Sequence, residues 1–206
     1  MSTMPERLAD VGAPAHLAAL WFATVLREGF ALAASGTAAA FGDIGRDVLR
    51  DVLADVELDR PLDDAVEHVV SAMTGLDLHP DVVPAVRRMH AAGMRQVTLS
   101  KGAAAVAETL LTRAGVQDSF ERLLSVEDAD AWKPASAAYE YAAAVTGVRV
   151  DELMLVAVHP WDIHGAARAG LRTAWVDRRT GRYPGYLTVP DLTVRSLDEL
   201  ADHLGA

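Results

Sequence analysis

The C-terminal part of the chain alternates between amphipathic stretches and short, almost entirely apolar runs. Four amphipathic stretches end in a glycine followed by an apolar residue, the pattern of a helix closed by a left-handed glycine. These pairs are Gly93-Met94, Gly115-Val116, Gly147-Val148 and Gly170-Leu171. Apolar runs follow at 96–100, 122–126, 153–158 and 173–176, and a fifth lies at 192–194. The alternation predicts βαβ units, and therefore an α/β core with a Rossmann-like parallel sheet.

The first 78 residues show a different pattern, without a run that indicates a strand. Helical periodicity covers residues 14–36, 41–56 and 61–73, and Pro61 suits the first turn of its helix. The first of these helices is apolar on more than one face, which predicts packing neighbours on two sides. The N-terminal part is therefore expected to be helical.

These two patterns divide the chain into a short N-terminal segment (1–13), a helical cap (14–78) and the α/β core (79–206). The boundary falls near His79-Pro80, because a residue before proline is biased away from the helical region. We expect the cap and the core to meet around a site at the carboxyl ends of the strands, where open α/β sheets hold ligands.

Composition and charge narrow the class of protein. The 206 residues carry 29 acidic and 19 basic side chains, a net charge of −10, which disfavours nucleic acid and anionic membrane surfaces as partners. The chain has no cysteine, which excludes disulfides, thiolate metal sites and a cysteine nucleophile. Because no signal-peptide pattern and no continuous apolar run of membrane length occur, we expect a cytoplasmic protein.

Three polar stretches follow the predicted strands in a fixed order. They are Ser100-Lys101-Gly102, Lys133-Pro134 and the segment 159–162, His-Pro-Trp-Asp. A hydroxyl and free N–H groups at a helix start favour an anion, and a lysine adds positive charge. Imidazole and carboxylate groups near a strand end suit acid–base chemistry.

Each stretch also has a simpler interpretation when it is considered alone. Ser100 and Asp162 could be ordinary helix N-caps, Lys133 could be an exposed residue before a helix, and the two histidines, His159 and His164, could be solvated. Their common position at successive strand ends, about 30 residues apart, favours a shared site.

With these motifs the chain resembles the haloacid dehalogenase (HAD) superfamily, most closely its type II 2-haloacid dehalogenase branch. The resemblance rests on LAALWFATVLREGFAL, LSVEDADAWKPASAAYEYA and LMLVAVHPWDIHGAARAGLRTAWVDR, which cover both parts of the chain. It implies a Rossmann-like core with a helical cap and a site between them. It also implies that Ser100 anchors substrate, that Lys133 stabilises the nucleophile and a bound anion, and that Asp162 helps to activate water.

The sequence departs from that family at several positions. The family's nucleophile is an aspartate at the end of a first strand, but here Glu6 and Asp10 precede the cap and neither follows an apolar strand. We therefore expect that first strand and its nucleophile to be absent. Lys101 replaces an asparagine of the second motif. In the fourth motif, Ala157 and His159 stand where the family often has serine and asparagine.

Three functions remain open at this point. The first is a HAD-like enzyme without the aspartate nucleophile, which uses its pocket for acid–base chemistry on a small carbonyl-bearing substrate. The second is an ordinary dehalogenase or phosphatase whose start lies further upstream. The third is a non-catalytic binding or dimerisation protein, and a homodimer is compatible with all three.

The candidate residues can be grouped by role. The predicted catalytic residues are Asp162, Lys133 and His159. The predicted substrate-binding residues are Ser100, Lys101, Trp21, Phe30, Trp161 and His164. We expect neither a cofactor nor a metal. Magnesium is not favoured, because it needs several oxygen ligands and Asp162 is the carboxylate that the pattern places at a strand end.

Overall fold

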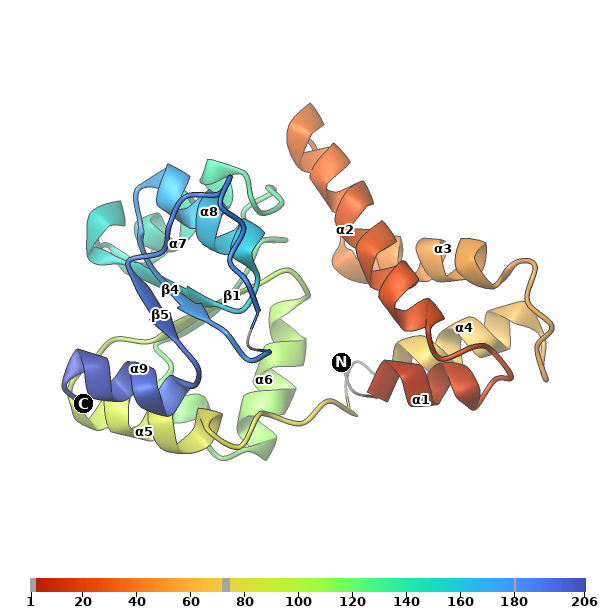
Figure 1. The fold of residues 1–206 in the computed structure, drawn as a ribbon, viewed down its shortest axis with the longest axis horizontal. Coiled ribbons are helices and arrows are strands. Elements are labelled where there is room, and N and C mark those ends of the chain that lie inside the picture. Colours follow the sequence, from red (N-terminus) through yellow and green to blue (C-terminus); the bar gives the residue numbers. More distant parts are fainter. Residues whose placement is uncertain (1–2, 72–74, 180) are drawn as a thin grey trace.

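The computed structural model describes residues 3–71, 75–179 and 181–206 and forms two regions, a helical cap and an α/β core (Figure 1). The cap helices are α1 (Thr3–Ala9), α2 (Leu17–Ser35), α3 (Phe41–Leu53) and α4 (Leu62–Val70). The core strands are β1 (Val97–Ser100), β2 (Arg122–Ser125), β3 (Met154–Ala157), β4 (Arg172–Val176) and β5 (Leu192–Val194). The core helices are α5 (Val82–Ala91), α6 (Ala104–Arg113), α7 (Ser136–Thr146), α8 (Pro160–Ala169) and α9 (Leu197–Leu204), with short 3₁₀ turns at Gln117–Ser119 and Val150–Glu152.

The strands are all parallel, as the alternation of helices and apolar runs predicts. β1 pairs with β2, β3 with β4, and β4 with β5. Helices cover both faces of the larger sheet. Leu200 on α9 packs with Val176 and Val194, whereas Tyr139 on α7 and Ala166 on α8 pack with Leu155. The predicted α/β core with a Rossmann-like parallel sheet is therefore confirmed.

Glycine closes the four predicted helices in the expected way. Gly93, Gly115, Gly147 and Gly170 have φ between 66° and 94°. In each case the following N–H donates to a carbonyl five residues earlier, as in the bond from Leu171 to Ala166 at 3.0 Å. Only glycine adopts this left-handed backbone without a steric cost. The glycine at each helix end could therefore be recognised from the sequence.

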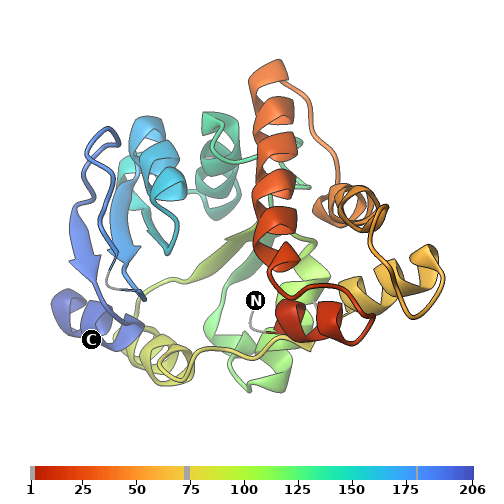
Figure 2. The same ribbon diagram turned by 45° about the vertical axis from the view of Figure 1, so that its right-hand side comes forward.

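The cap is built around one hydrophobic cluster, which Trp132 of the core also joins. Buried apolar residues from all four of its helices form one cluster, including Met4, Leu8, Trp21, Val25, Leu49, Leu53, Val66 and Val69. The Trp21 indole N–H donates to the Gly45 carbonyl at 2.8 Å and so ties α2 to α3. Residues of α1 belong to this cluster, so residues 3–11 pack as part of the helical region. Figure 2 shows α1 lying against the lower end of α2.

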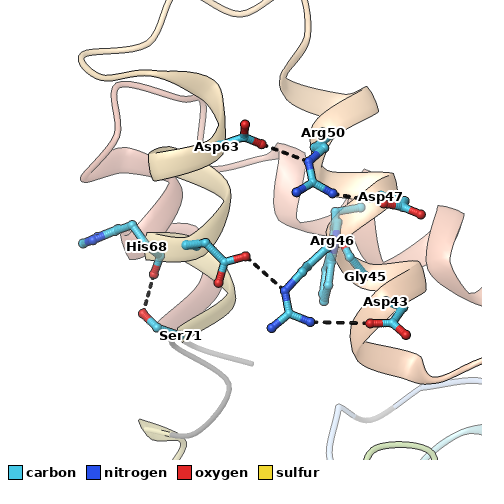
Figure 3. Close-up of polar contacts among 10 residues, drawn as sticks. Asp43, Gly45, Arg46, Asp47, Arg50, Asp63, His68 and Ser71 are labelled. Carbon is cyan, nitrogen blue, oxygen red and sulfur yellow. Dashed lines mark hydrogen bonds and ion pairs between the residues drawn. The ribbon is translucent and has the colours of Figure 1, made fainter.

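Exposed ion pairs join α3 to α4 on the outside of the cap (Figure 3). Arg46 pairs with Glu67 at 3.0 Å, and Arg50 pairs with Asp63 at 3.1 Å. Exposed pairs of this kind contribute little to stability, about 0–1 kcal/mol each. The apolar cluster beneath them is what holds the cap together.

Helix α2 packs on two sides, as its apolar pattern predicts. Trp21 and Val25 face the cap cluster, and Phe22 and Phe30 contact aromatic residues of the core. By length and composition alone, α2 is a helix that could cross a membrane. In the fold it is part of the cap instead, although Leu20 is 52% exposed.

Helix bounds in the cap differ slightly from the sequence prediction. α2 begins at Leu17 rather than at Pro14, because residues 14–16 form a turn in which the Pro14 carbonyl accepts the Leu17 N–H. Pro61 directly precedes α4 instead of occupying its first turn. α3 ends at Leu53, and the predicted end of the third helix at residue 73 lies outside the described residues.

The core sheet is divided into two parts. Across the described residues, β1 has β2 as its hydrogen-bonded neighbour and β3 has β4, and no pairing joins β1 to β3. Two side chains at the end of β3 are correspondingly open to solvent, Val156 at 39% and Val158 at 42%. Each part therefore ends in a strand edge whose backbone groups lack a sheet partner.

Candidate functional site at the junction of cap and core

A buried ion pair lies at the carboxyl ends of the strands. The Lys133 ammonium donates to Asp162 Oδ2 at 3.1 Å, and the Tyr139 hydroxyl donates to Asp162 Oδ1 at 2.7 Å. The side chains of Lys133 and Asp162 are only 5% and 10% exposed. Both carboxylate oxygens of Asp162 therefore have a donor, as a buried charge requires.

The environment of Tyr139 makes it a proton donor in this group. Burial, followed by the negative charge and the hydrogen bond of Asp162, raises the pKa of the Tyr139 phenol far above its usual value. The phenol therefore keeps its proton across the neutral range. Its bond to the carboxylate also ties α7 to the start of α8.

Local backbone structure brings these residues together. Asp162 is the third residue of α8, which begins two residues beyond the end of β3, so its carboxylate lies near the positive end of the helix. Lys133 lies in the loop between β2 and α7, and its peptide bond to Pro134 is cis. α7 begins at Ser136. Pro134 therefore precedes the first residue of α7 by two positions.

Lys101 lies in a cage of three aromatic rings. Its ammonium nitrogen is 4.0 Å from the ring centroid of Trp161, 4.7 Å from that of Trp132 and 4.8 Å from that of Phe30. The nitrogen is buried and has no hydrogen-bond partner. Phe30 belongs to the cap and the other three residues to the core, so the cage closes the junction between the two regions.

Burial lowers the pKa of Lys101 to about 8. The negative charge of Asp162 opposes this change, whereas the positive charge of Lys133 adds to it. The aromatic faces attract the protonated form, since the electron-rich side of each ring favours a cation. The loss of hydration outweighs the attraction of the ammonium to Asp162 and to the rings. A sizeable fraction of Lys101 is therefore a neutral amine near pH 8.

His159 lies in a row of aromatic rings between the cap and α8. Its ring is 5.7 Å from Phe22 and 5.4 Å from Trp161, and Trp161 is 5.2 Å from Phe30. Burial lowers the pKa of His159. The negative charge of Asp162 opposes this change, and the positive charge of Lys101 adds to it. The imidazole is therefore neutral at neutral pH and is able to accept a proton.

Two polar contacts hold the cap to the loop that carries Lys133. The Trp132 indole N–H donates to the Ala39 carbonyl at 2.7 Å, and the Phe41 N–H donates to Glu127 at 3.2 Å. Gly29 makes this packing possible, because a Cβ atom there would lie 1.9 Å from the Trp132 ring. The sequence reasoning missed Trp132 as part of the site.

The structure uses Ser100 within its own loop. The Ser100 hydroxyl donates to the Gly102 carbonyl at 2.6 Å, and the Ser125 hydroxyl donates to the same carbonyl at 3.0 Å. The N-cap of α6 is Ala103. Ser100 is therefore not an N-cap, and its hydroxyl shapes the turn that presents Lys101.

Two predicted substrate-binding residues lie away from this group. Trp21 is completely buried in the cap cluster, where it bonds to Gly45. His164 accepts the Thr188 N–H through Nδ1 at 3.1 Å, in an exposed contact. The residues that do come together are Lys101, Lys133, His159, Trp161, Asp162 and Phe30. Tyr139 was missed because its role depends on a contact between α7 and α8.

The described residues contain no group of three or more acidic, histidine or cysteine side chains arranged to hold a metal ion. The donor set at the site does not fit magnesium either, since both oxygens of Asp162 are already bonded to Lys133 and Tyr139. Among the described residues, a hollow of about 510 Å³ lies between α2 and α3, and another of about 270 Å³ lies beside Phe120, both away from this group.

Comparison with known proteins identifies the family. A model of haloacid dehalogenase-like hydrolases matches residues 13–170, so the chain belongs to this family. It is 32% identical over 121 residues to haloacetate dehalogenase H-2 of Moraxella sp. (strain B), covering 59% of this chain and 54% of that protein. It is 29% identical over 138 residues to an (S)-2-haloacid dehalogenase of Pseudomonas putida, covering 67% and 61%. The match thus spans less than two thirds of either relative.

Solved structures show the same fold over nearly the whole chain. A dehalogenase crystallised with an intermediate aligns with a TM-score of 0.88 at 25% identity, over 98% of this chain and 89% of that one. The L-2-haloacid dehalogenase of Xanthobacter autotrophicus aligns with a TM-score of 0.78 at 24% identity, over 90% and 84%. The resemblance drawn from the sequence to the type II haloacid dehalogenase branch is confirmed.

Proposed function

We propose that this member of the haloacid dehalogenase-like family catalyses proton transfer on a small carbonyl-bearing substrate held between cap and core. The observation that carries the proposal is the position of the half-buried His159, whose ring stacks on Trp161 beside Lys101 and close to the Lys133–Asp162 pair at the strand ends. His159 removes a proton beside the carbonyl, and positive charge from Lys133 and from the protonated fraction of Lys101 stabilises the enolate-like oxygen. Asp162 and Tyr139 fix the position of Lys133.

This chemistry follows from the way Asp162 is held. A carboxylate whose two oxygens are engaged by Lys133 and Tyr139 is poorly placed to attack carbon. Glu6 and Asp10 do not offer a replacement, since they lie in α1 and directly after it, and Asp10 bonds to His68 in the cap. Acid–base catalysis needs no carboxylate nucleophile, so the groups present suffice for it.

The experiment is an exchange assay in D₂O. Small ketones and aldehydes are incubated with the protein, and loss of the proton next to the carbonyl is followed by NMR. We expect His159→Gln to lower the exchange rate by about 100-fold or more, because it removes the base. Asp162→Asn should also lower it by releasing Lys133. Unchanged exchange in both variants would contradict the proposal.

A second candidate is hydrolysis of a 2-haloacid, which the names of the relatives suggest. The divided sheet favours it, since a strand between β1 and β3 would complete the sheet and could carry a nucleophilic aspartate at its end. Chloride release from 2-chloropropionate, together with no proton exchange, would support this candidate against the first. The in-frame DNA upstream of Met1 would show directly whether such a strand is encoded.

A third candidate is a binding or dimerisation protein without catalysis. The enclosed Lys101 cage is compatible with it, because no water-exposed surface remains on the amine nitrogen. A homodimer in light scattering, with neither proton exchange nor chloride release, would favour it. We further propose a cytoplasmic location and action on small molecules without a metal cofactor.

A further inference from the structure

The chain contains only two lysines among its 19 basic residues, and both lie at this site. Lys133 is engaged in the ion pair with Asp162. Lys101 has no acceptor for its protons and is enclosed by Phe30, Trp132 and Trp161. Placing a lysine where it cannot form a hydrogen bond costs free energy, so the position calls for an explanation other than stability.

The surroundings of Lys101 favour an amine with a free electron pair. The titratable groups that face it are Asp162 on α8, His159 directly before α8, and Lys133 in the loop before α7. Asp162 is shared with Lys133, and His159 is neutral near pH 7. Lys101 is thus partly unprotonated at a pH where an exposed lysine, with a pKa near 10.5, would be almost fully protonated.

We propose that Lys101 is a nucleophilic amine that binds small apolar aldehydes or ketones covalently, as an imine, inside its aromatic cage. The three rings would pack against the apolar body of the compound, while the amine meets its carbonyl carbon. This inference deepens the proposed function and rests on it, since both need a carbonyl compound to enter between the cap and the core.

The covalent step balances without an oxidant or a reductant. The Lys101 nitrogen lone pair attacks the carbonyl carbon, and the C=O π electrons move to oxygen, which takes up the proton lost by nitrogen. The carbinolamine hydroxyl then gains a proton from solvent and leaves as water, while the nitrogen lone pair forms the C=N bond. The nitrogen returns its second proton to solvent, so that a neutral imine remains. One water is released for each imine formed, and hydrolysis reverses the reaction.

Entry of the compound requires Phe30 to move away from Trp161, because Lys101 Nζ is enclosed in the closed arrangement. Phe30 lies on α2 and the other walls lie on the core, so a small separation of the two regions opens the cage along one side. The ring contact of 5.2 Å between Phe30 and Trp161 is the contact that must break.

The test is reductive trapping with phenylacetaldehyde. The protein is incubated with this aldehyde and cyanoborohydride at pH 7.5, digested, and mapped by mass spectrometry. With two lysines and the N-terminus as its primary amines, the chain gives an unambiguous map. We expect Lys101 to be labelled at least about tenfold faster than Lys133, because the Lys133 amine is held in its ion pair with Asp162 whereas the Lys101 amine has no such partner. Lys101→Met should remove that label and leave the N-terminal label.

Labelling of the N-terminus without labelling of Lys101 in the folded wild-type protein would overturn the inference. So would labelling of Lys101 that appears only in denaturant. Phe30→Ala provides a matched variant, since it removes the cap wall and should accelerate the labelling of Lys101 but not of the N-terminus.

The two proposals fail separately with the same probe, because phenylacetaldehyde also carries exchangeable protons beside its carbonyl. A Lys101 adduct without His159-dependent exchange in D₂O supports the imine and contradicts the proposed proton transfer. Exchange without an adduct contradicts the imine and supports proton transfer.

Discussion

At the residue scale, Lys101 shows how burial changes the chemistry of a side chain. An exposed lysine is a cation at neutral pH because water solvates its ammonium group. Around Lys101 the faces of three aromatic rings replace that water. Burial lowers its pKa to about 8, against the attraction of Asp162. The same change that creates a neutral amine must also cost stability, which can be measured.

We expect Lys101→Met to stabilise the fold at pH 7 by ~1–2 kcal/mol, because partial exposure of the residue and attraction to the rings reduce the full cost of the shift. The sign follows from proton linkage. Below pH 8 both the folded and the unfolded wild type carry the charge, so the penalty is present in full. Between about pH 8 and 10.5 Lys101 loses its proton in the folded form before it does in the unfolded form. The free energy of unfolding of wild type therefore rises relative to that of the variant.

Denaturant unfolding of both proteins at pH 7 and at pH 10.5 measures this difference. The gap between them should shrink at the higher pH. A wild type that is more stable than Lys101→Met at pH 7 would show that the cage stabilises the ammonium more than burial penalises it.

At the element scale, Gly29 determines how closely α2 can approach the core. A Cβ atom at this position would lie 1.9 Å from the ring of Trp132, which is itself a wall of the Lys101 cage. We expect Gly29→Ala to destabilise the protein by about 1–3 kcal/mol through overpacking and to alter tryptophan fluorescence.

Gly42→Ala in α3 is the control for helix propensity, since its Cβ would meet only the flexible Arg46 guanidinium at 3.4 Å. It should be neutral or stabilise the helix by up to about 1 kcal/mol. Equal stability of the two variants in chemical denaturation would contradict the packing role of Gly29.

The divided sheet makes a second prediction at this scale. The Ser100 carbonyl accepts a bond from the β2 side, and the Leu153 carbonyl accepts one from the β4 side. Backbone groups of successive residues in a strand point to opposite sides. The N–H groups of Leu99 and Val156 therefore point toward the unpaired edges.

We expect the Leu99 and Val156 amides to exchange with D₂O at least about tenfold faster than those of Thr98 and Leu155, which point into the sheets. Residue-resolved hydrogen exchange by NMR measures this ratio. Slow exchange at all four positions would show that another strand covers these edges in solution. A repeat at higher dilution would distinguish a second copy of the chain from the chain itself.

At the scale of the whole molecule, Asp81 ties three distant segments of the core together. It precedes α5, accepts two bonds from Arg178 at 3.0 and 3.1 Å, and accepts the Leu197 N–H at 2.7 Å. Burial alone would raise the pKa of Asp81, but the Arg178 guanidinium and the Leu197 N–H outweigh it and lower the pKa.

We expect Asp81→Asn to lower the free energy of unfolding by about 2–4 kcal/mol at pH 7, because it leaves Arg178 without its partner. Since the folded pKa is depressed, the contribution of Asp81 is present above its ordinary value of 3.8 and is lost as the pH falls through the folded value. Wild type and variant should therefore converge in acid.

Urea unfolding from pH 7 down to pH 3 tests this dependence. Asp151→Asn is the matched control, because Asp151 also pairs with an arginine but lies exposed on the surface. It should change stability little at any pH. A gap between wild type and Asp81→Asn that stays constant down to pH 3 would contradict the assigned role.

Much of the core was determined by the sequence alone. Gly93, Gly115, Gly147 and Gly170 marked helix ends because the left-handed backbone after a helix favours glycine on local steric grounds. All five predicted strands are present with bounds shifted by no more than two residues. The sequence also placed Lys101, Lys133 and Asp162 at strand ends. Residues that follow parallel strands along the chain lie at the carboxyl edge of the sheet.

The contacts of the site were decided only by the tertiary structure. Tyr139 reaches Asp162, Trp132 reaches Lys101, and Trp21 turns into the cap, because each depends on how helices pack across the junction. Periodicity shows which face of a helix is apolar but not which neighbour will cover it. For the same reason the enclosed, unbonded amine of Lys101 is a property of the fold, although the residue itself was visible in the sequence.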